Sequence, residues 1–264
     1  MSLPGLILVA VAGLVLGSFL NVCIARLPRH ESVVLPGSHC PWCHRPIRAW
    51  DNIPVLSFVL LGGRCRGCHR PISWRYPLVE LATALLFLLS ALTYGINLTG
   101  IGTMVLCFLL LGLAMMDAET LTLPDTFTVT GMALGLVYYA VTPHTSLRDR
   151  LLHIASAVLW GALYAALLLL VRWIYFRLRH QEGLGIGDAK LIAMIAIWQG
   201  PVLTAEVLFL GVVSAALFGM VWVAMHPREG LRAMLPLGTF LSAAAILAVF
   251  RGTKILKWYM HFYR

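Results

Sequence analysis

Residues 102 to 116 read GTMVLCFLLLGLAMM, an uncharged apolar run that ends at Asp117. A membrane-spanning helix needs about 20 predominantly apolar residues, and runs of this character recur along the chain. They lie near 4–25, 77–95, 99–116, 126–142, 151–176, 188–200, 202–225 and 233–250. The sixth is short, so residues 188–225 could instead form one re-entrant hairpin. The pattern predicts an all-α, polytopic membrane protein with about eight transmembrane helices.

Composition supports this class. Of the 264 residues, 60% are hydrophobic and 12% are charged, whereas soluble domains carry about 25% charged residues. The first run lacks a basic n-region and a clear cleavage site, so it is not read as a signal peptide. The net charge of +9 fits Lys and Arg in cytoplasmic loops, and we expect membrane lipids, not nucleic acid, as partners.

The chain is expected to have two regions, with a basic, cysteine-bearing loop in the first. Residues 1–76 would form one helix and this loop, and residues 77–264 a transmembrane helical bundle. The loop, residues 26–76, is rich in arginine and should therefore face the cytoplasm. It contains a short repeat, CPWCHRPI at 40–47 and CRGCHRPI at 65–72.

The repeat places four cysteines in two C-x-x-C pairs: Cys40, Cys43, Cys65 and Cys68. Two such knuckles can complete a tetrahedral thiolate site, so we expect one structural zinc ion. Disulfides rarely persist in the cytoplasm; reduced thiols or two redox-active pairs are the alternatives. His44 and His69 could be alternative ligands, but four thiolates close the site without them.

Two acids stand where a cytoplasmic loop meets an apolar helix. Counting eight spans places both Asp117 and Asp188 on the cytoplasmic side, and Asp188 follows the alternating glycines of GLGIGDAKL. Two facing carboxylates can share a proton, with one activating water and the other binding the scissile carbonyl, which is aspartic protease chemistry. Gly185 and Gly187 would let a substrate strand approach the backbone. Alternatively, Asp188 simply caps a helix.

The dipoles of the predicted helices make the two aspartates inequivalent. Asp117 ends one helix and Asp188 begins another, so Asp117 would hold the shared proton and Asp188 would be ionised. Lys190 does not share a helix face with Asp188, and we expect it to be a solvated lysine at the membrane interface.

The chain resembles the bacterial type IV prepilin peptidases over nearly its whole length. The matching motifs are GSFLNVCIARLP at 17–28, the paired C-x-x-C loop, DNIPVLS at 51–57, ISWRYPLVEL at 72–81, DAETLTLPD at 117–125 and GLGIGDAKL at 183–191. They stand in the family's order. One departure is His44 and His69, at positions where glycine is common.

The resemblance implies a bifunctional enzyme of the bacterial inner membrane with Asp117 and Asp188 as its catalytic pair. It would cut the leader from type IV prepilins and type II secretion pseudopilins after a glycine, on the cytoplasmic side. It would then methylate the new N-terminal residue with S-adenosylmethionine. No Rossmann-type unit is visible, so the loop of residues 26–76 is the expected place for the methyl donor.

A basic leader needs an attractive partner. Local acids could supply it, and the candidates are Glu31, Asp51, Glu119, Asp125 and Glu182; anionic lipid head groups are the alternative. Glu182 is favoured because it lies beside the second aspartate motif. Paired membrane aspartates also suit an ion- or proton-coupled transporter. A zinc-scaffolded assembly factor without catalysis is a third interpretation.

Overall fold

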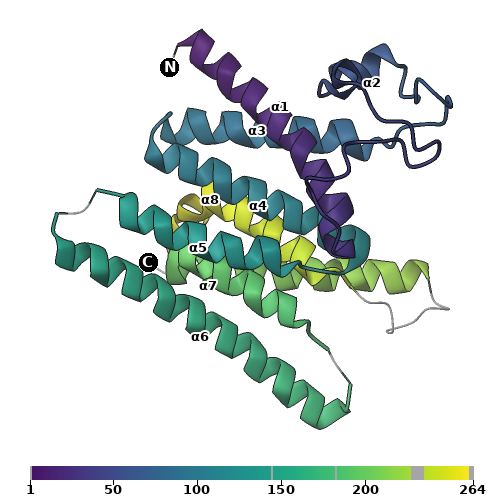
Figure 1. Cartoon of the computed structure of the whole chain (residues 1–264). Coiled ribbons are helices and arrows are strands. Elements are labelled where there is room, and N and C mark those ends of the chain that lie inside the picture. The colour runs from purple at the N-terminus through teal and green to yellow at the C-terminus, as the bar shows by residue number, and fades with distance from the viewer. Residues whose placement is uncertain (1, 144, 182, 227–234, 262–264) are drawn as a thin grey trace. The chain divides into compact units, whose positions relative to one another are not determined.

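The computed structural model describes all residues except 1, 144, 182, 227–234 and 262–264, with side chains as far as Gly252. The helices are α1 (Leu3–Arg26), α2 (Leu56–Leu60), α3 (Arg75–Tyr94), α4 (Leu98–Thr120), α5 (Asp125–Val141), α6 (Leu147–Arg179), α7 (Ile186–Met225) and α8 (Leu237–His261). Short 3₁₀ turns are η1 (Leu27–Arg29) and η2 (Ala49–Asn52). The described ranges contain isolated β-bridges but no strand. The predicted all-α class is confirmed (Figure 1).

Five helices are long and apolar enough to cross a membrane: α1 extended by η1, α3, α4, α6 and α7. Helix α5 has 17 residues, and the apolar part of α8, Leu237–Gly252, is also shorter. Helix α7 has 40 residues, about 60 Å at 1.5 Å per residue and so twice a bilayer core of about 30 Å. A break at Gly200 divides it, so the expected count of about eight spans is matched roughly.

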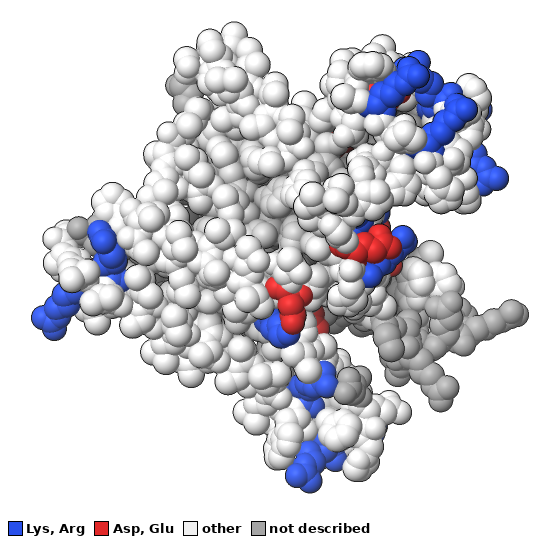
Figure 2. Space-filling model, viewed as in Figure 1, with Lys and Arg blue, Asp and Glu red and all other residues white. Residues whose placement is uncertain are grey.

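Helix α6 shows how charge is distributed along a span. Arg148 and Arg150 lie near its start and Arg172, Arg177 and Arg179 near its end. Figure 2 shows blue side chains gathered at both ends of this helix and an uncharged flank between them. From Arg150 to Arg172 the helix rises about 33 Å, which is close to the thickness of a hydrocarbon core. By length, composition and charge distribution, α6 is suited to cross a membrane.

The chain divides into two compact units, Met1–Phe108 and Leu109–Arg264. The boundary falls within α4. The sequence suggested a division at residue 76, where the cysteine loop ends. That division into two functional regions stays a prediction.

In the first unit, α1 and α3 are in close antiparallel contact along glycines of α1. A Cβ atom on Gly13 would lie 2.6 Å from Cα of Ala84, and one on Gly17 would lie 2.7 Å from Cα of Glu80. Small residues allow such close approach between membrane helices. One turn further along α1, Asn21 Nδ2 donates to the carbonyl of Tyr76 at 3.1 Å.

The loop between these helices contains a strained turn. Val55 has φ 60° and ψ −48°, and the N–H of Leu56 donates to the carbonyl of Pro54 at 2.6 Å. This is a classic γ-turn, which is rare and strained, all the more so for a β-branched residue. The N–H of Val55 donates to Glu80 Oε2 at 2.7 Å, and Glu80 is buried in α3. The carboxylate therefore ties the loop to the helix pair.

In the second unit, α7 packs against α5, α6 and α8, and its first half is buried from Asp188 to Ile197 with Lys190 partly exposed. Gly200 interrupts the helix with φ 75° and ψ 179°. The break is held by neighbouring side chains. The hydroxyl of Tyr164 donates to the carbonyl of Pro201 at 2.7 Å, and Gln199 Nε2 donates to the carbonyl of Ala245 at 3.0 Å. The interruption lies where the apolar run 188–200 ends and the run 202–225 begins.

Candidate active site and metal centre

Asp117 lies in the last turn of α4 and is 5% exposed. Its Oδ2 atom accepts a hydrogen bond from the backbone N–H of Thr239 at 2.7 Å, and the Thr239 hydroxyl lies 3.1 Å from the same oxygen. Thr239 belongs to the first turn of α8. A carboxylate inside an apolar bundle is thus held by groups from a second helix.

Asp188 lies in the first turn of α7 and is 9% exposed. Gly185 is the N-cap residue, and its N–H donates to Asp188 Oδ2 at 3.1 Å. The side chain therefore reaches back over the helix start, as the third residue of a capping box does. Asp188 does contribute to capping, and the same bond fixes the orientation of its carboxylate.

The structure brings the two aspartates together. Leu123 contacts the backbone next to each of them. A Cβ on Gly187 would lie 3.0 Å from Leu123 Cβ, and one on Gly238 would lie 2.9 Å from Leu123 Cδ1 and 3.1 Å from Asp117 Oδ2. The carboxylates are close enough for the charge of Asp117 to act on Asp188. Two neighbouring buried carboxyl groups can share a proton, so the expected proton sharing stays a prediction.

In the first unit, the four loop cysteines converge. Their Sγ atoms all lie within 4.8 Å of one another, and those of Cys40 and Cys68 are 3.8 Å apart. Zinc–sulfur bonds of about 2.3 Å place the sulfurs of a tetrahedral site about 3.8 Å apart. The four cysteines therefore fit a metal ion of this kind.

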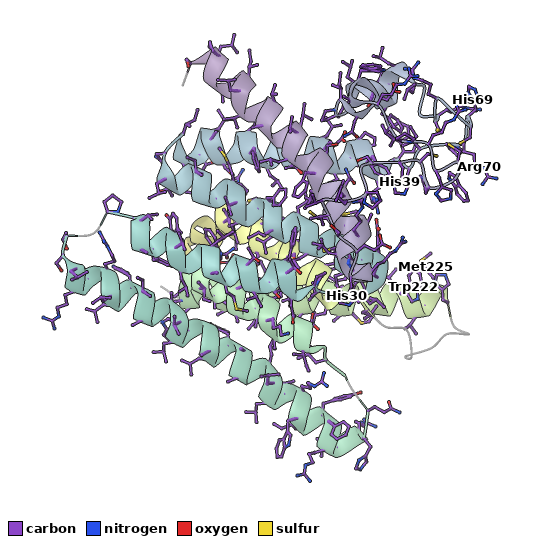
Figure 3. The ribbon with its side chains drawn as sticks, in the orientation of Figure 1. His30, His39, His69, Arg70, Trp222 and Met225 are labelled. Atoms are coloured by element: carbon purple, nitrogen blue, oxygen red, sulfur yellow. The ribbon has the colours of Figure 1, made fainter. Side chains whose placement is uncertain are left out.

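The two knuckles have the same backbone structure. In each, the N–H of the first cysteine donates to the carbonyl of an arginine, and the N–H of the histidine donates to the carbonyl of that cysteine. The pairs are Cys40–Arg45 at 3.0 Å, His44–Cys40 at 2.9 Å, Cys65–Arg70 at 2.9 Å and His69–Cys65 at 2.9 Å. The guanidinium of Arg70 lies 4.4 Å from the ring centre of Trp42 and so joins the second knuckle to the first. Figure 3 shows His39, His69 and Arg70 together in this loop.

The backbone also polarises one sulfur. N–H groups of Cys68 and Gly67 face Cys65, and they lower the pKa of its thiol to about 6. The pKa of Cys68 is raised to about 11, because burial and the neighbouring sulfurs outweigh a backbone hydrogen bond from Arg70. A thiolate is the form that binds metal, so the loop favours at least one ligand in its binding form.

Comparison with known proteins shows which family the chain belongs to. The family model of the bacterial peptidase A24 N-terminal domain matches residues 11–94, and that of the type IV leader peptidase family matches residues 104–220. The prepilin leader peptidase/N-methyltransferase of Stutzerimonas stutzeri is 35% identical, and the alignment covers 96% of this chain and 93% of that protein. The chain belongs to the type IV leader peptidase family.

Other relatives agree. The prepilin leader peptidase/N-methyltransferase of Pseudomonas putida is 34% identical, covering 94% of this chain and 91% of the relative. That of Neisseria gonorrhoeae is 37% identical, covering 79% and 80%. No solved structure gave a significant match. The resemblance seen in the sequence is confirmed, and both predicted aspartates lie within the segment matched by the type IV leader peptidase model.

For this leader peptidase, the glycines before Asp188 have packing roles. A Cβ on Gly183 would lie 2.6 Å from the ring of Tyr175. Arg172 Nη1 donates to the carbonyl of Leu184 at 2.6 Å, which holds the glycine segment against α6. The expected contact of Gly185 and Gly187 with substrate stays a prediction, and Glu182 lies outside the described residues.

Sequence reasoning missed two features of the site. Lys190 is partly exposed, as expected, but its ion pair was not foreseen: its Nζ lies 2.6 Å from Asp125 Oδ1 in α5. Thr239 was not singled out, although a threonine three residues after a proline at the start of an apolar run is a signal for a helix N-terminus. The partners themselves are far apart in sequence, so spacing could not identify them.

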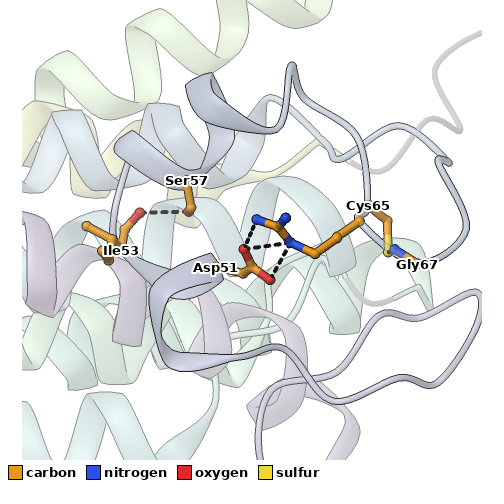
Figure 4. Close-up of polar contacts among 6 residues, drawn as sticks. Asp51, Ile53, Ser57, Cys65 and Gly67 are labelled. Atoms are coloured by element: carbon orange, nitrogen blue, oxygen red, sulfur yellow. Dashed lines mark hydrogen bonds and ion pairs between the residues drawn. The ribbon is translucent and has the colours of Figure 1, made fainter.

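The acids expected to attract a basic leader differ in their partners. Asp51 forms a bidentate ion pair with Arg66, with distances of 2.7–3.1 Å (Figure 4). Arg66 lowers the pKa of Asp51, mainly through this hydrogen bonding. Asp125 is paired with Lys190. Glu31 and Glu119 are exposed.

Proposed function

We propose that the chain is a membrane aspartic endopeptidase that removes leader peptides from type IV prepilins and pseudopilins and methylates the new N-terminal residue. The observation that carries this proposal is the buried pair Asp117 and Asp188 in a chain of the type IV leader peptidase family. Family membership favours the peptidase over the transporter and over an assembly factor without catalysis.

The pair can perform peptide hydrolysis without a covalent intermediate. One carboxylate takes a proton from a water molecule, whose oxygen attacks the scissile carbonyl carbon. The protonated carboxyl group donates to the carbonyl oxygen, which stabilises the tetrahedral intermediate. The carboxyl group that took the proton from water then gives it to the departing amine nitrogen as the C–N bond breaks, and the other carboxylate takes back a proton from a hydroxyl group of the intermediate. The two aspartates thus exchange roles during one turnover.

The substrate is a basic leader followed by an apolar helix, cut after a glycine. We place the protein in the bacterial inner membrane with the pair facing the cytoplasm, which agrees with the arginine-rich loop. We assign leader binding to Glu182 beside the second aspartate motif, with anionic lipid head groups as the alternative.

The peptidase is tested with purified full-length protein in detergent, a prepilin substrate and mass spectrometry of the product. Asp117→Asn and Asp188→Asn should each abolish loss of the leader, since each removes one member of the pair. Asp149→Asn, at the start of α6, is the matched control and should retain activity. Normal cleavage by Asp117→Asn would refute the dyad.

S-adenosylmethionine is the proposed methyl donor, and the first unit offers polar groups that fit it. Asn21 Oδ1 is buried and has no hydrogen-bond partner among the described residues, and the buried Glu80 lies on the adjoining face of α3. Two acceptors suit the donor's cationic groups. When bound, the donor supplies a methyl group to the free N-terminal amine. Asn21→Ala should cleave prepilin but no longer add the mass of one methyl group.

We assign one structural zinc ion to Cys40, Cys43, Cys65 and Cys68, where it would organise the loop without taking part in catalysis. Purified protein should contain one zinc per chain by elemental analysis. A strong chelator should remove it and make the loop between α1 and α3 sensitive to protease, because the loop has little core of its own. Cys65→Ser should behave like the chelated protein. A loop equally resistant with and without metal would contradict the assignment.

A further inference from the structure

The first turn of α8 encloses Asp117 closely. The N–H of Thr239 donates to its Oδ2 atom at 2.7 Å, and the Thr239 hydroxyl lies 3.1 Å from the same oxygen. Gly238 has no room for a side chain, since a Cβ there would lie 3.1 Å from both Cγ and Oδ2 of Asp117. The backbone of α8 therefore packs directly on the carboxylate.

These donors change the electrostatics of the pair. The first N–H groups of a helix have no partner within the helix and carry partial positive charge. Asp117 ends α4, where the dipole disfavours a negative charge, but it accepts hydrogen bonds from the start of α8. Direct, charge-assisted hydrogen bonds outweigh the dipole of a helix end. Asp188 receives one hydrogen bond that the structure describes, at 3.1 Å from Gly185.

The Thr239 hydroxyl can respond to the charge of Asp117. It has one proton, and it lies 3.1 Å from Asp117 Oδ2 and 2.9 Å from the carbonyl oxygen of Ala114. When Asp117 is ionised, the hydroxyl donates to the carboxylate. When Asp117 has taken a proton, the hydroxyl can turn to Ala114 and accept from the carboxyl group instead.

We propose that Thr239, next to the close-packed Gly238, holds Asp117 as the ionised general base, with the shared proton on Asp188. The proposal rests on the proposed peptidase function, and it reverses the assignment that helix ends alone predict. Thr239 is a positioning residue, since it acts through Asp117. Among the described residues, the charged groups next to the pair in sequence are Lys190, which is ion-paired with Asp125, and the exposed Glu119.

The test compares full-length variants in prepilin cleavage across pH. Thr239→Val keeps the N–H and the side-chain shape but loses the hydroxyl, whereas Thr239→Ser keeps both. We expect Thr239→Val to lower kcat by roughly tenfold or more, as loss of a hydrogen bond to a charged group does, with KM changed by less than about twofold. The acidic limb of the kcat profile should move to higher pH, because the base is harder to ionise. Thr239→Ser should restore both.

A matched control is Thr83→Val in α3. Thr83 is also fully buried, and its hydroxyl donates to the carbonyl of its own helix at Val79, 2.8 Å away. Its pH profile should follow the unmodified protein. If Thr239→Val leaves kcat and the acidic limb unchanged, or moves only the basic limb, the assignment is overturned while the peptidase function stands. If the unmodified protein fails to cut prepilin, the proposed function itself is lost.

Discussion

His44 and His69 show how a single backbone angle explains a preference at one residue. Each follows the second cysteine of a knuckle, and each has φ 55°. In this left-handed region a Cβ atom is disfavoured by about 1–2 kcal/mol, and glycine escapes that cost. The sequence shows the histidines as departures from the family's common glycine, but it does not show the angle that gives glycine its advantage.

Replacing either histidine with glycine should therefore be tolerated or stabilising. The relief of about 1–2 kcal/mol is partly offset by about 0.5–1 kcal/mol of extra freedom in the unfolded chain. Zinc affinity of His44→Gly and His69→Gly, measured by competition with a coloured chelator, should equal or exceed that of the unmodified protein. Arg45→Gly, without a positive φ to relieve, should weaken binding. Weaker binding by both histidine variants would indicate that the rings themselves are ligands.

The sequence identifies the two candidate catalytic aspartates but not the residues of α8 that contact Asp117. Asp117 and Asp188 stand out because acids are rare beside apolar runs. Thr239 and Gly238 do not, because small residues at the start of an apolar helix are common. The pairing of Lys190 with Asp125 depends on how α5 and α7 pack, which spacing along the chain does not encode.

Among the elements, α7 depends most on one residue. Gly200 combines φ 75° with ψ 179°, a region that is essentially restricted to glycine. A Cβ there would meet nothing within 4 Å, so any effect of a substitution comes from the backbone alone. The apolar runs at 188–200 and 202–225 indicate an interruption at this place, but the glycine conformation that makes the interruption is visible only in the structure.

Gly200→Ala should reduce the free energy of unfolding by about 1–3 kcal/mol through backbone strain. Thermal or detergent-induced unfolding of the purified protein measures this. Gly37→Ala is the matched control, because a Cβ at Gly37 also meets nothing and its φ is not positive. If both variants unfold alike, the break does not require the glycine conformation.

For the whole molecule, α6 provides the test of membrane orientation. Leu147 and Leu178, near its two ends, are exposed, and so is Leu159 in its apolar middle. We expect Leu147→Cys to react with a membrane-impermeant maleimide from outside the cell and Leu178→Cys from the cytoplasm. Leu159→Cys should not react from either side, because lipid covers it. Labelling is measured in intact cells and inverted vesicles against the unmodified chain, and reaction of both end positions from one side would contradict the topology.

At this scale the sequence predicts much: the membrane class, the apolar runs and the order of the motifs. It does not predict that the division between the compact units falls within α4, because an unbroken apolar helix gives no sign of a boundary. Nor does it predict which loop residues form hydrogen bonds with which helices, as Val55 does with Glu80. Such contacts join residues that lie far apart along the chain.

The strained turn at Val55 has a consequence for the order of folding. Its backbone conformation is costly by itself and is compensated by the hydrogen bond to Glu80. That acceptor is in position only after α3 has inserted and packed on the glycines of α1. Membrane helices form and associate in separate stages. The loop should therefore adopt its final shape after the helix pair has assembled, and its resistance to protease would report completed insertion.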